Sequence, residues 1–157
     1  MVREDDLAAA IASMVRLNRR AAELAGDFGL HSATDITGYG LLGHAAELAE
    51  NSGVGLRLSL AQVPLLPGAL EYSRQEIVPG GLNRNRSFLL GAGTVRLMEG
   101  IDAAAAQLLF DPQTSGGLLF AVPPERAAEL RERFAAAHEP LWQIGEGTEG
   151  AGIEVHP

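Results

Sequence analysis

The chain has 157 residues, of which 46% are hydrophobic, so it is long enough to bury a core and one domain is the expected organisation. Cysteine is absent, which excludes disulfides, thiolate metal sites and a cysteine nucleophile. The formal net charge of -8 argues against a surface for nucleic acid or an anionic membrane, because such surfaces need clustered cations.

The sequence shows no targeting or membrane segment. No apolar run approaches the roughly 18 residues of a membrane span. The N-terminus carries Glu4, Asp5 and Asp6 and lacks the basic-then-apolar order of a signal peptide. We therefore expect a cytoplasmic protein with no membrane partner.

The longest helical pattern runs from Asp5 to Phe28. Apolar residues recur there at steps of three and four, which predicts one helix with an apolar stripe. Such a stripe normally faces a core, and we expect this for Met14 as well.

A strand followed sharply by a helix is predicted next. Residues 32–36 are small and partly β-branched, and an apolar stripe at helical spacing continues from Leu41 to Ala49. Gly38 and its neighbouring glycines lie where the backbone must bend. Thr37 is expected to cap the helix with its hydroxyl.

This junction suggests phosphate chemistry. A helix N-terminus favours phosphate, and Asp35 places a hard oxygen ligand just before it, as a phosphate–Mg²⁺ complex requires. Thr37 and Gly38 are then candidate phosphate contacts. The alternative is that Asp35 only caps the helix and that the glycines serve packing. His31 and His44 have no partner at metal-ligand spacing, so we expect His31 at the surface or its boundary and His44 as a satisfied helix histidine. The alternative for His44 is that it helps to position a ligand.

The middle of the chain gives three predicted elements. Apolar residues at every second position predict a half-buried strand over Val54–Leu60. A short helix is expected over Ala69–Gln75, and another over Ile101–Gln107 with Asp102 near its start.

The composition of Val78–Arg86 predicts a loop. It holds a dense cluster of amide and guanidinium donors, and Gly80, Gly81, Arg84 and Asn85 are candidates for binding an anion. The alternative is an ordinary solvated turn.

A polar loop flanked by apolar residues spans Leu108–Val122 and leads into a buried strand over Leu118–Val122. A small anion nest there would use the hydroxyls and glycine N–H groups of Thr114, Ser115, Gly116 and Gly117. The alternative is a polar connector.

The remaining chain predicts a helix after Pro123 and two final strands, Leu141–Ile144 and Gly152–Val155. Helices and strands with some direct strand-to-strand links indicate an α+β fold, in which a mixed β-sheet packs against helices.

Three stretches occur in one order and together resemble a known family. They are ATDITGYGLLGH at 33–44, PGG at 79–81 with Arg84-Asn85, and FDPQTSGGL at 110–118. The chain resembles, over nearly its whole length, the C-terminal domain of selenophosphate synthetase (selenide, water dikinase). That family belongs to the superfamily of aminoimidazole ribonucleotide synthetase, thiamine-monophosphate kinase and the hydrogenase maturation dehydratase. Leu82 stands where the family pattern usually has Thr.

The resemblance implies an ATP-dependent phosphotransfer, in which selenide, ATP and water give selenophosphate, AMP and orthophosphate with Mg²⁺ as cofactor. It implies an aminoimidazole ribonucleotide synthetase C-terminal-domain-like fold. It also implies that Asp35 is a metal ligand.

In this family the catalytic lysine, the Cys or selenocysteine and further metal-binding aspartates lie on an N-terminal domain, which is the expected partner. None of these features is found in the chain. We therefore expect residues 1–157 to be one domain, the C-terminal half of a two-domain synthetase, which binds ATP, selenide and Mg²⁺ productively only with its partner and is catalytically silent alone. The alternatives are the C-terminal domain of another superfamily member, such as a thiamine-monophosphate kinase, and a non-catalytic ligand-binding module.

Overall fold

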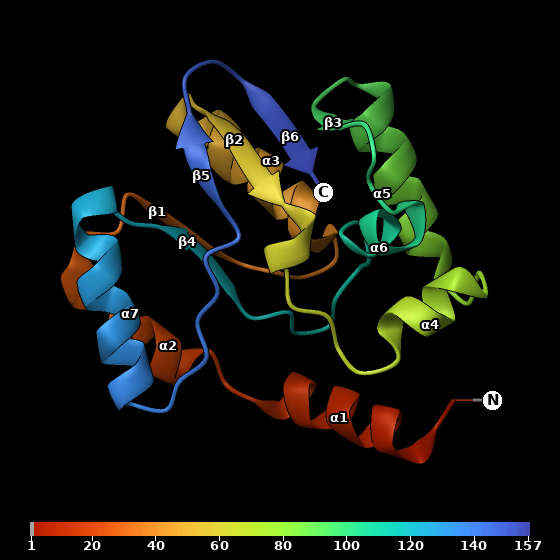
Figure 1. Cartoon of the computed structure of the whole chain (residues 1–157), viewed down its shortest axis with the longest axis horizontal. Coiled ribbons are helices and arrows are strands. Elements are labelled where there is room, and N and C mark those ends of the chain that lie inside the picture. The colour runs from red at the N-terminus through yellow and green to blue at the C-terminus, as the bar shows by residue number, and fades with distance from the viewer. Residues whose placement is uncertain (1) are drawn as a thin grey trace.

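A computed structural model describes residues 2–157 of the chain, and Figure 1 shows how its elements are arranged. The helices are α1 Glu4–Val15, α2 Arg19–Ala25, α3 Gly40–Ser52, α4 Ala69–Arg74, α5 Gly80–Gly91, α6 Ala103–Leu108 and α7 Ala127–Ala136. The strands are β1 Ser32–Asp35, β2 Gly55–Ser59, β3 Val95–Leu97, β4 Leu118–Ala121, β5 Gly145–Thr148 and β6 Gly152–His156.

The main sheet has four strands in the order β3-β6-β2-β5. β6 runs parallel to both β2 and β3, whereas β5 is antiparallel to β2, so the sheet is mixed. β1 and β4 form a separate antiparallel pair in which Asp35 lies opposite Leu118. The predicted α+β fold with a mixed sheet packed against helices is confirmed.

The two faces of the main sheet differ in chemistry because side chains alternate along each strand. On one face Leu58 lies beside Val155 of β6, and both are buried against α3, α5 and α6 in the larger core. On the other face Arg57 pairs with Glu146 on β5 at 2.8 Å. Helices α3, α5 and α6 therefore cover the Leu58 face, and this layer carries most of the segments discussed below.

A second, smaller core lies where α2 and α7 pack together, at the left of Figure 1. Its fully buried members include Phe28 and Phe134, and Phe120 from β4 packs against them. The β1–β4 pair thus connects the two cores. The helix predicted after Pro123 is confirmed as a short 3₁₀ turn followed by α7.

The prediction of one helix from Asp5 to Phe28 is wrong. Arg16 adopts an extended conformation after α1, and α2 then turns toward the smaller core. The apolar stripe of α1 is exposed rather than buried: Leu7, Ile11 and Met14 are 52%, 48% and 41% exposed. The expectation that Met14 faces a core is therefore wrong as well.

Polar contacts hold α1 instead. The buried carboxylate of Asp6 accepts hydrogen bonds from the guanidinium of Arg3 and the hydroxyl of Tyr72 on α4, at 2.8 and 2.6 Å. These two bonds hold the pKa of Asp6 below its ordinary value. At the other end of α1, Arg16 pairs with Glu139 at 2.7 Å.

Two further predicted elements are corrected. The segment predicted as a loop over Val78–Arg86 is instead largely helical, because α5 begins at Gly80 and buries Leu82 and Leu89 in the larger core. The strand predicted over Leu141–Ile144 begins later, at Gly145, where a Cβ atom would collide with the backbone of β2. The remaining predicted elements lie within one or two residues of the observed ones.

Of the helices that the structure describes, none combines the length and the apolar character that crossing a bilayer requires.

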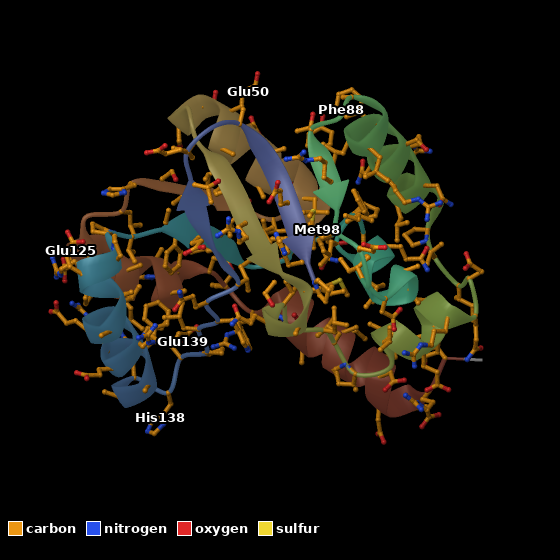
Figure 2. All side chains as sticks on the ribbon, turned by 45° about the horizontal axis from the view of Figure 1, so that its top comes forward. Glu50, Phe88, Met98, Glu125, His138 and Glu139 are labelled. Carbon is orange, nitrogen blue, oxygen red and sulfur yellow. The ribbon has the colours of Figure 1, made fainter. Side chains whose placement is uncertain are left out.

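The smaller core predicts that two phenylalanines differ greatly in how much stability their replacement by alanine costs. Phe134 is 1% exposed, so Phe134→Ala should lower the free energy of unfolding by about 3–5 kcal/mol. Phe88 projects from α5 and is 74% exposed (Figure 2), so Phe88→Ala should change it by less than about 0.5 kcal/mol. Urea denaturation measures both. Equal losses would contradict a second core built on Phe134.

Candidate functional site

The turn between β1 and α3 is built against a distant loop. Gly40 begins α3 with φ +71°, and a Cβ atom there would lie 2.8 Å from the carbonyl carbon of Phe110 and 2.9 Å from the carbonyl oxygen of Asp111. Only glycine fits this close approach without strain. The glycine at this bend is thus required by the packing of the 110–117 loop.

Backbone hydrogen bonds join the same two segments. The N–H of Gln113 donates to the carbonyl of Thr37 at 2.9 Å, and the N–H of Gly116 donates to that of Ile36 at 2.8 Å. In return the N–H of Ile36 donates to the carbonyl of Gly117 at 2.9 Å. Residues 36–37 and 113–117 therefore form one interlocked pair of loops.

The first turns of α5 complete this assembly. The side-chain amide of Asn85 donates to the carbonyl oxygens of both Gly38 and Phe110, each at 3.0 Å. Gly81 lies against the ring of Pro112, where a Cβ atom would come within 2.9 Å of the ring. Three motifs that are far apart in the sequence thus meet at one place.

The N-terminus of α5 is open for an anion. Its N-cap position is Pro79, which provides no side-chain cap, so the N–H groups of Gly80 and Gly81 have no helical acceptor. The guanidinium of Arg84 lies beside Gly81, and its side chain is exposed. This helix end therefore combines backbone donors with a nearby cation.

Asp35 is the exposed last residue of β1. The N-cap position of α3 is Tyr39 and no side chain caps that helix, so Asp35 does not serve as its cap. Within residues 2–157 no group of three or more His, Cys, Asp or Glu side chains is placed to hold a metal ion. Asp35 can therefore supply one oxygen ligand, and the other ligands of a Mg²⁺ ion would come from phosphates, water or another part of the protein.

The expectation that Thr37 caps α3 is wrong. Its hydroxyl lies 2.9 Å from the Nε2 atom of His44, one helical turn into α3. His44 is buried behind the turn, and only its Nε2 atom has a hydrogen-bond partner, so the expectation of a satisfied helix histidine is met at one ring nitrogen and not at the other. His31 is exposed, as expected.

The structure separates the other candidates by exposure and bonding. Gly38, Thr114 and Gly116 are exposed, and Ser115 and Gly117 are partly exposed. The N–H of Gly116 is already used by Ile36, so this amide is not free for the predicted anion nest. The amide of Asn85 is likewise engaged with protein carbonyls, which makes it a structural clamp in this structure.

Asp111 is a site residue that the sequence reasoning did not single out. It is half-buried among the three segments, and burial raises the pKa of its carboxyl above the ordinary value. The amide of Gln113 donates to it at 2.7 Å. The sequence did contain a signal for it: Asp111 stands between apolar runs just before Pro112, and carboxylates are rare in such buried surroundings.

Comparison with known proteins gives a family match over nearly the whole chain. The family described as "AIR synthase related protein, C-terminal domain" matches residues 4–156. A selenide, water dikinase of Pelobacter propionicus is 48% identical over 125 residues, covering 76% of this chain and 34% of the relative. The selenide, water dikinase 2 of Peptoclostridium acidaminophilum is 43% identical over 123 residues, covering 78% of this chain and 35% of the relative. The chain thus spans about a third of the length of these relatives.

Solved structures share the fold at low identity. The thiamine monophosphate kinase of Aquifex aeolicus matches with a TM-score of 0.54 and 20% identity, over 98% of this chain and 41% of that one. E. coli HypE, a hydrogenase maturation protein, matches with a TM-score of 0.56 and 20% identity, over 91% of this chain and 36% of that one. These likenesses show the fold alone.

The Asn85 clamp predicts a stability loss that a neighbouring asparagine should not show. Asn85→Ala leaves the carbonyls of Gly38 and Phe110 without their donor, so the free energy of unfolding should fall by about 1–3 kcal/mol. Asn83 is exposed on the same helix, and Asn83→Ala is the matched control. Thermal and urea unfolding measure the difference. If the two variants lose equal stability, Asn85 is not a clamp.

The raised pKa of Asp111 predicts that replacing this residue increases the stability of the fold in a pH-dependent way. Because its pKa is higher in the folded than in the unfolded state, ionisation destabilises the fold as pH rises through these two values. Asp111→Asn should therefore unfold at higher urea than the parent chain at pH 7, and the difference should vanish below the ordinary aspartate pKa. A gain that persists in acid would contradict burial as the cause.

Proposed function

The chain belongs to the AIR synthase related protein, C-terminal domain family, and from this premise we propose that it is the C-terminal domain of a selenide, water dikinase. The relatives that carry this name support the proposal, since they are 43% and 48% identical to the chain over more than three quarters of its length. The proposed reaction converts selenide, ATP and water to selenophosphate, AMP and orthophosphate.

The meeting of the three motifs carries the proposal. The exposed carboxylate of Asp35 caps no helix, and Asn85 ties its turn to the α5 helix whose N-terminus is open. A carboxylate on one segment, together with backbone donors and the guanidinium of Arg84 on a segment tied to it, suits a phosphate chain that carries a divalent cation.

Each residue would have a limited role. Asp35 would hold Mg²⁺ as one of its oxygen ligands, and the bound ion would neutralise charge on the phosphates. The N–H groups of Gly80 and Gly81 and the guanidinium of Arg84 would bind phosphate oxygens. Thr114 and Ser115 would add hydroxyl contacts from the facing loop. Leu82 is fully buried in the larger core, so no contact with substrate is proposed for it.

The rest of the enzyme would come from an N-terminal domain, with residues 1–157 forming its C-terminal partner domain. The chain spans about a third of its relatives, and its candidate site has one exposed carboxylate and no lysine. We therefore propose that the ATP-binding groups, the nucleophile and further metal ligands lie on the partner domain, and that the enzyme is cytoplasmic. Alone, this chain should hydrolyse no ATP.

Adding the missing part in trans tests the proposal. The N-terminal two thirds of the Pelobacter propionicus relative would be mixed with this chain, and AMP and selenophosphate formation from ATP and selenide would be measured. We expect activity only in the mixture, and Asp35→Asn should lower it by at least about tenfold because a ligand of the metal is lost. Asp27→Asn, an exposed aspartate outside the site, is the matched control.

The controls separate the alternatives. Restored activity that is indifferent to Asp35→Asn would remove this residue from the metal site while keeping the domain assignment. A mixture that phosphorylates thiamine monophosphate but not selenide would support a thiamine-monophosphate kinase. Tight binding of ATP by this chain alone would instead support an independent ligand-binding module.

A further inference from the structure

Helix α1 turns its large apolar side chains away from the rest of the molecule, at whose edge it lies (bottom of Figure 1). Leu7, Ile11 and Met14 recur at steps of four and three, so they share one face of the helix, and Val15 extends it. All four side chains are exposed, and together they are called the α1 face. An amphipathic helix normally places its apolar stripe against a core, so the arrangement in α1 is inverted.

The opposite side of α1, which faces the molecule, carries small and polar residues. Asp6 is buried there, and Ala9 and Ala10 are partly exposed. Within residues 2–157, neither hydrophobic core includes a side chain from α1. Apolar burial therefore does not hold this helix in place.

Polar contacts at both ends determine which way α1 is turned. At its start, the Asp6 carboxylate accepts the hydrogen bonds from Arg3 and Tyr72. Gly68, with φ +76°, makes room for this carboxylate, because a Cβ atom there would collide with it and with the ring of Tyr72. The ion pair between Arg16 and Glu139 holds the other end. The outward direction of the α1 face is thus built into the fold.

A helix held in this way is prepared for a partner. Its 12 residues would make only a marginal helix in water without tertiary contacts. Leu17, in the extended segment after α1, is 77% exposed and continues the apolar surface. Contiguous exposed apolar side chains mark interaction sites, and a surface held in its bound orientation loses less entropy on binding.

The extent of the α1 face indicates which partner covers it. A stable complex of two separate proteins buries about 800 Å² on each partner, which is more than one face of a 12-residue helix offers. A tethered partner needs less area, because the tether gives an effective concentration of about millimolar. A membrane surface is disfavoured, since the first turn of α1 is acidic and interfacial helices are rich in Lys and Arg.

We propose that the α1 face docks on an apolar surface of the N-terminal domain of the proposed enzyme. This inference rests on the proposed function. The matched family is a C-terminal domain, and about two thirds of the relatives' length lies outside the match, so the partner domain would be tethered just before α1. Glu4 lies on the same helix face, three residues before Leu7, and it forms no ion pair within residues 2–157. The partner surface therefore presents a basic side chain beside its apolar part.

Oxidation of Met14 reports whether the α1 face is covered. A chimera, in which this chain replaces the matching third of the Pelobacter propionicus relative, would be treated with hydrogen peroxide in parallel with the chain alone. Mass spectrometry follows the sulfoxides of Met14 and of Met98, which is partly exposed on a different segment and serves as internal reference. We expect Met14 to oxidise at least about fivefold more slowly in the chimera, and Met98 at an unchanged rate. Equal rates for Met14 in the two proteins would overturn the proposal.

Substitution within the α1 face makes the test specific. Ile11→Glu would bury a carboxylate against the partner, so Met14 in the chimera should oxidise nearly as fast as in the chain alone. Phe88→Glu is the matched control, because Phe88 is an exposed apolar residue on α5, and it should leave the protection intact. Protection that survives Ile11→Glu would contradict docking through this face. The two-part mixture described above gives the same comparison without a fusion.

Selenophosphate formation by the chimera is measured separately. Protection of Met14 in a chimera that makes no selenophosphate would support the docking face and count against the proposed reaction. Selenophosphate formation with Met14 unprotected would overturn the docking face and leave the proposed reaction standing. Protection of Met14 that grows with the concentration of the chain alone would assign the face to a second copy and overturn the proposal.

Discussion

Two hydrogen bonds from one side chain determine where the functional motifs lie. The turn after β1 and the loop after α6 expose backbone carbonyls that no strand or helix satisfies, and such groups need donors when they are buried. The Asn85 amide has two N–H groups and gives one to Gly38 and one to Phe110. The close approaches at Gly40 and Gly81 are possible only with the loops held in this relation. Asn85 thus acts on the site through the backbone.

The assembled surface supplies only some of the groups that a metal–phosphate site requires. It offers Asp35, the open N-terminus of α5 and Arg84, but within residues 2–157 no second carboxylate converges on Asp35 to hold a metal ion. Asp111 lies nearby as a half-buried carboxyl whose pKa is raised by burial, a state that is more often found in functional sites than elsewhere. The proposed role is that this surface binds part of a metal–phosphate complex and that a facing surface completes the coordination. Relatives about three times as long as this chain are compatible with that proposal.

Local signals in the sequence were sufficient for much of the fold. The apolar stripe of α3 and the position of Asp102 near the start of α6 are read from neighbouring residues, and both are confirmed. The structure adds that Asp102 caps α6 by accepting from two helical N–H groups. Tertiary packing decided the failures. Paired glycines before polar residues are typical of a loop, yet burial of Leu82 and Leu89 makes that segment a helix. Likewise the glycine-rich β5 is a strand because it pairs with β2.

The sequence singles out the segments of the candidate site but not the hydrogen bonds that join them. The motifs containing Asp35, Gly81 and Gly116 were singled out, and the structure brings them together. Their bonding could not be foreseen, because the partner of Asn85 or of Thr37 lies on another element and no pattern within the chain encodes it.

The central claim is that the three motif segments act as one phosphate-facing surface. The most direct measurement is amide ¹H–¹⁵N NMR of this chain, bound to the N-terminal part of a relative, during titration with a Mg²⁺ complex of a non-hydrolysable ATP analogue. The account predicts concerted shifts at residues 35–38, 80–85 and 114–117 with one common affinity. Shifts in one segment alone, or shifts with different affinities, would contradict it.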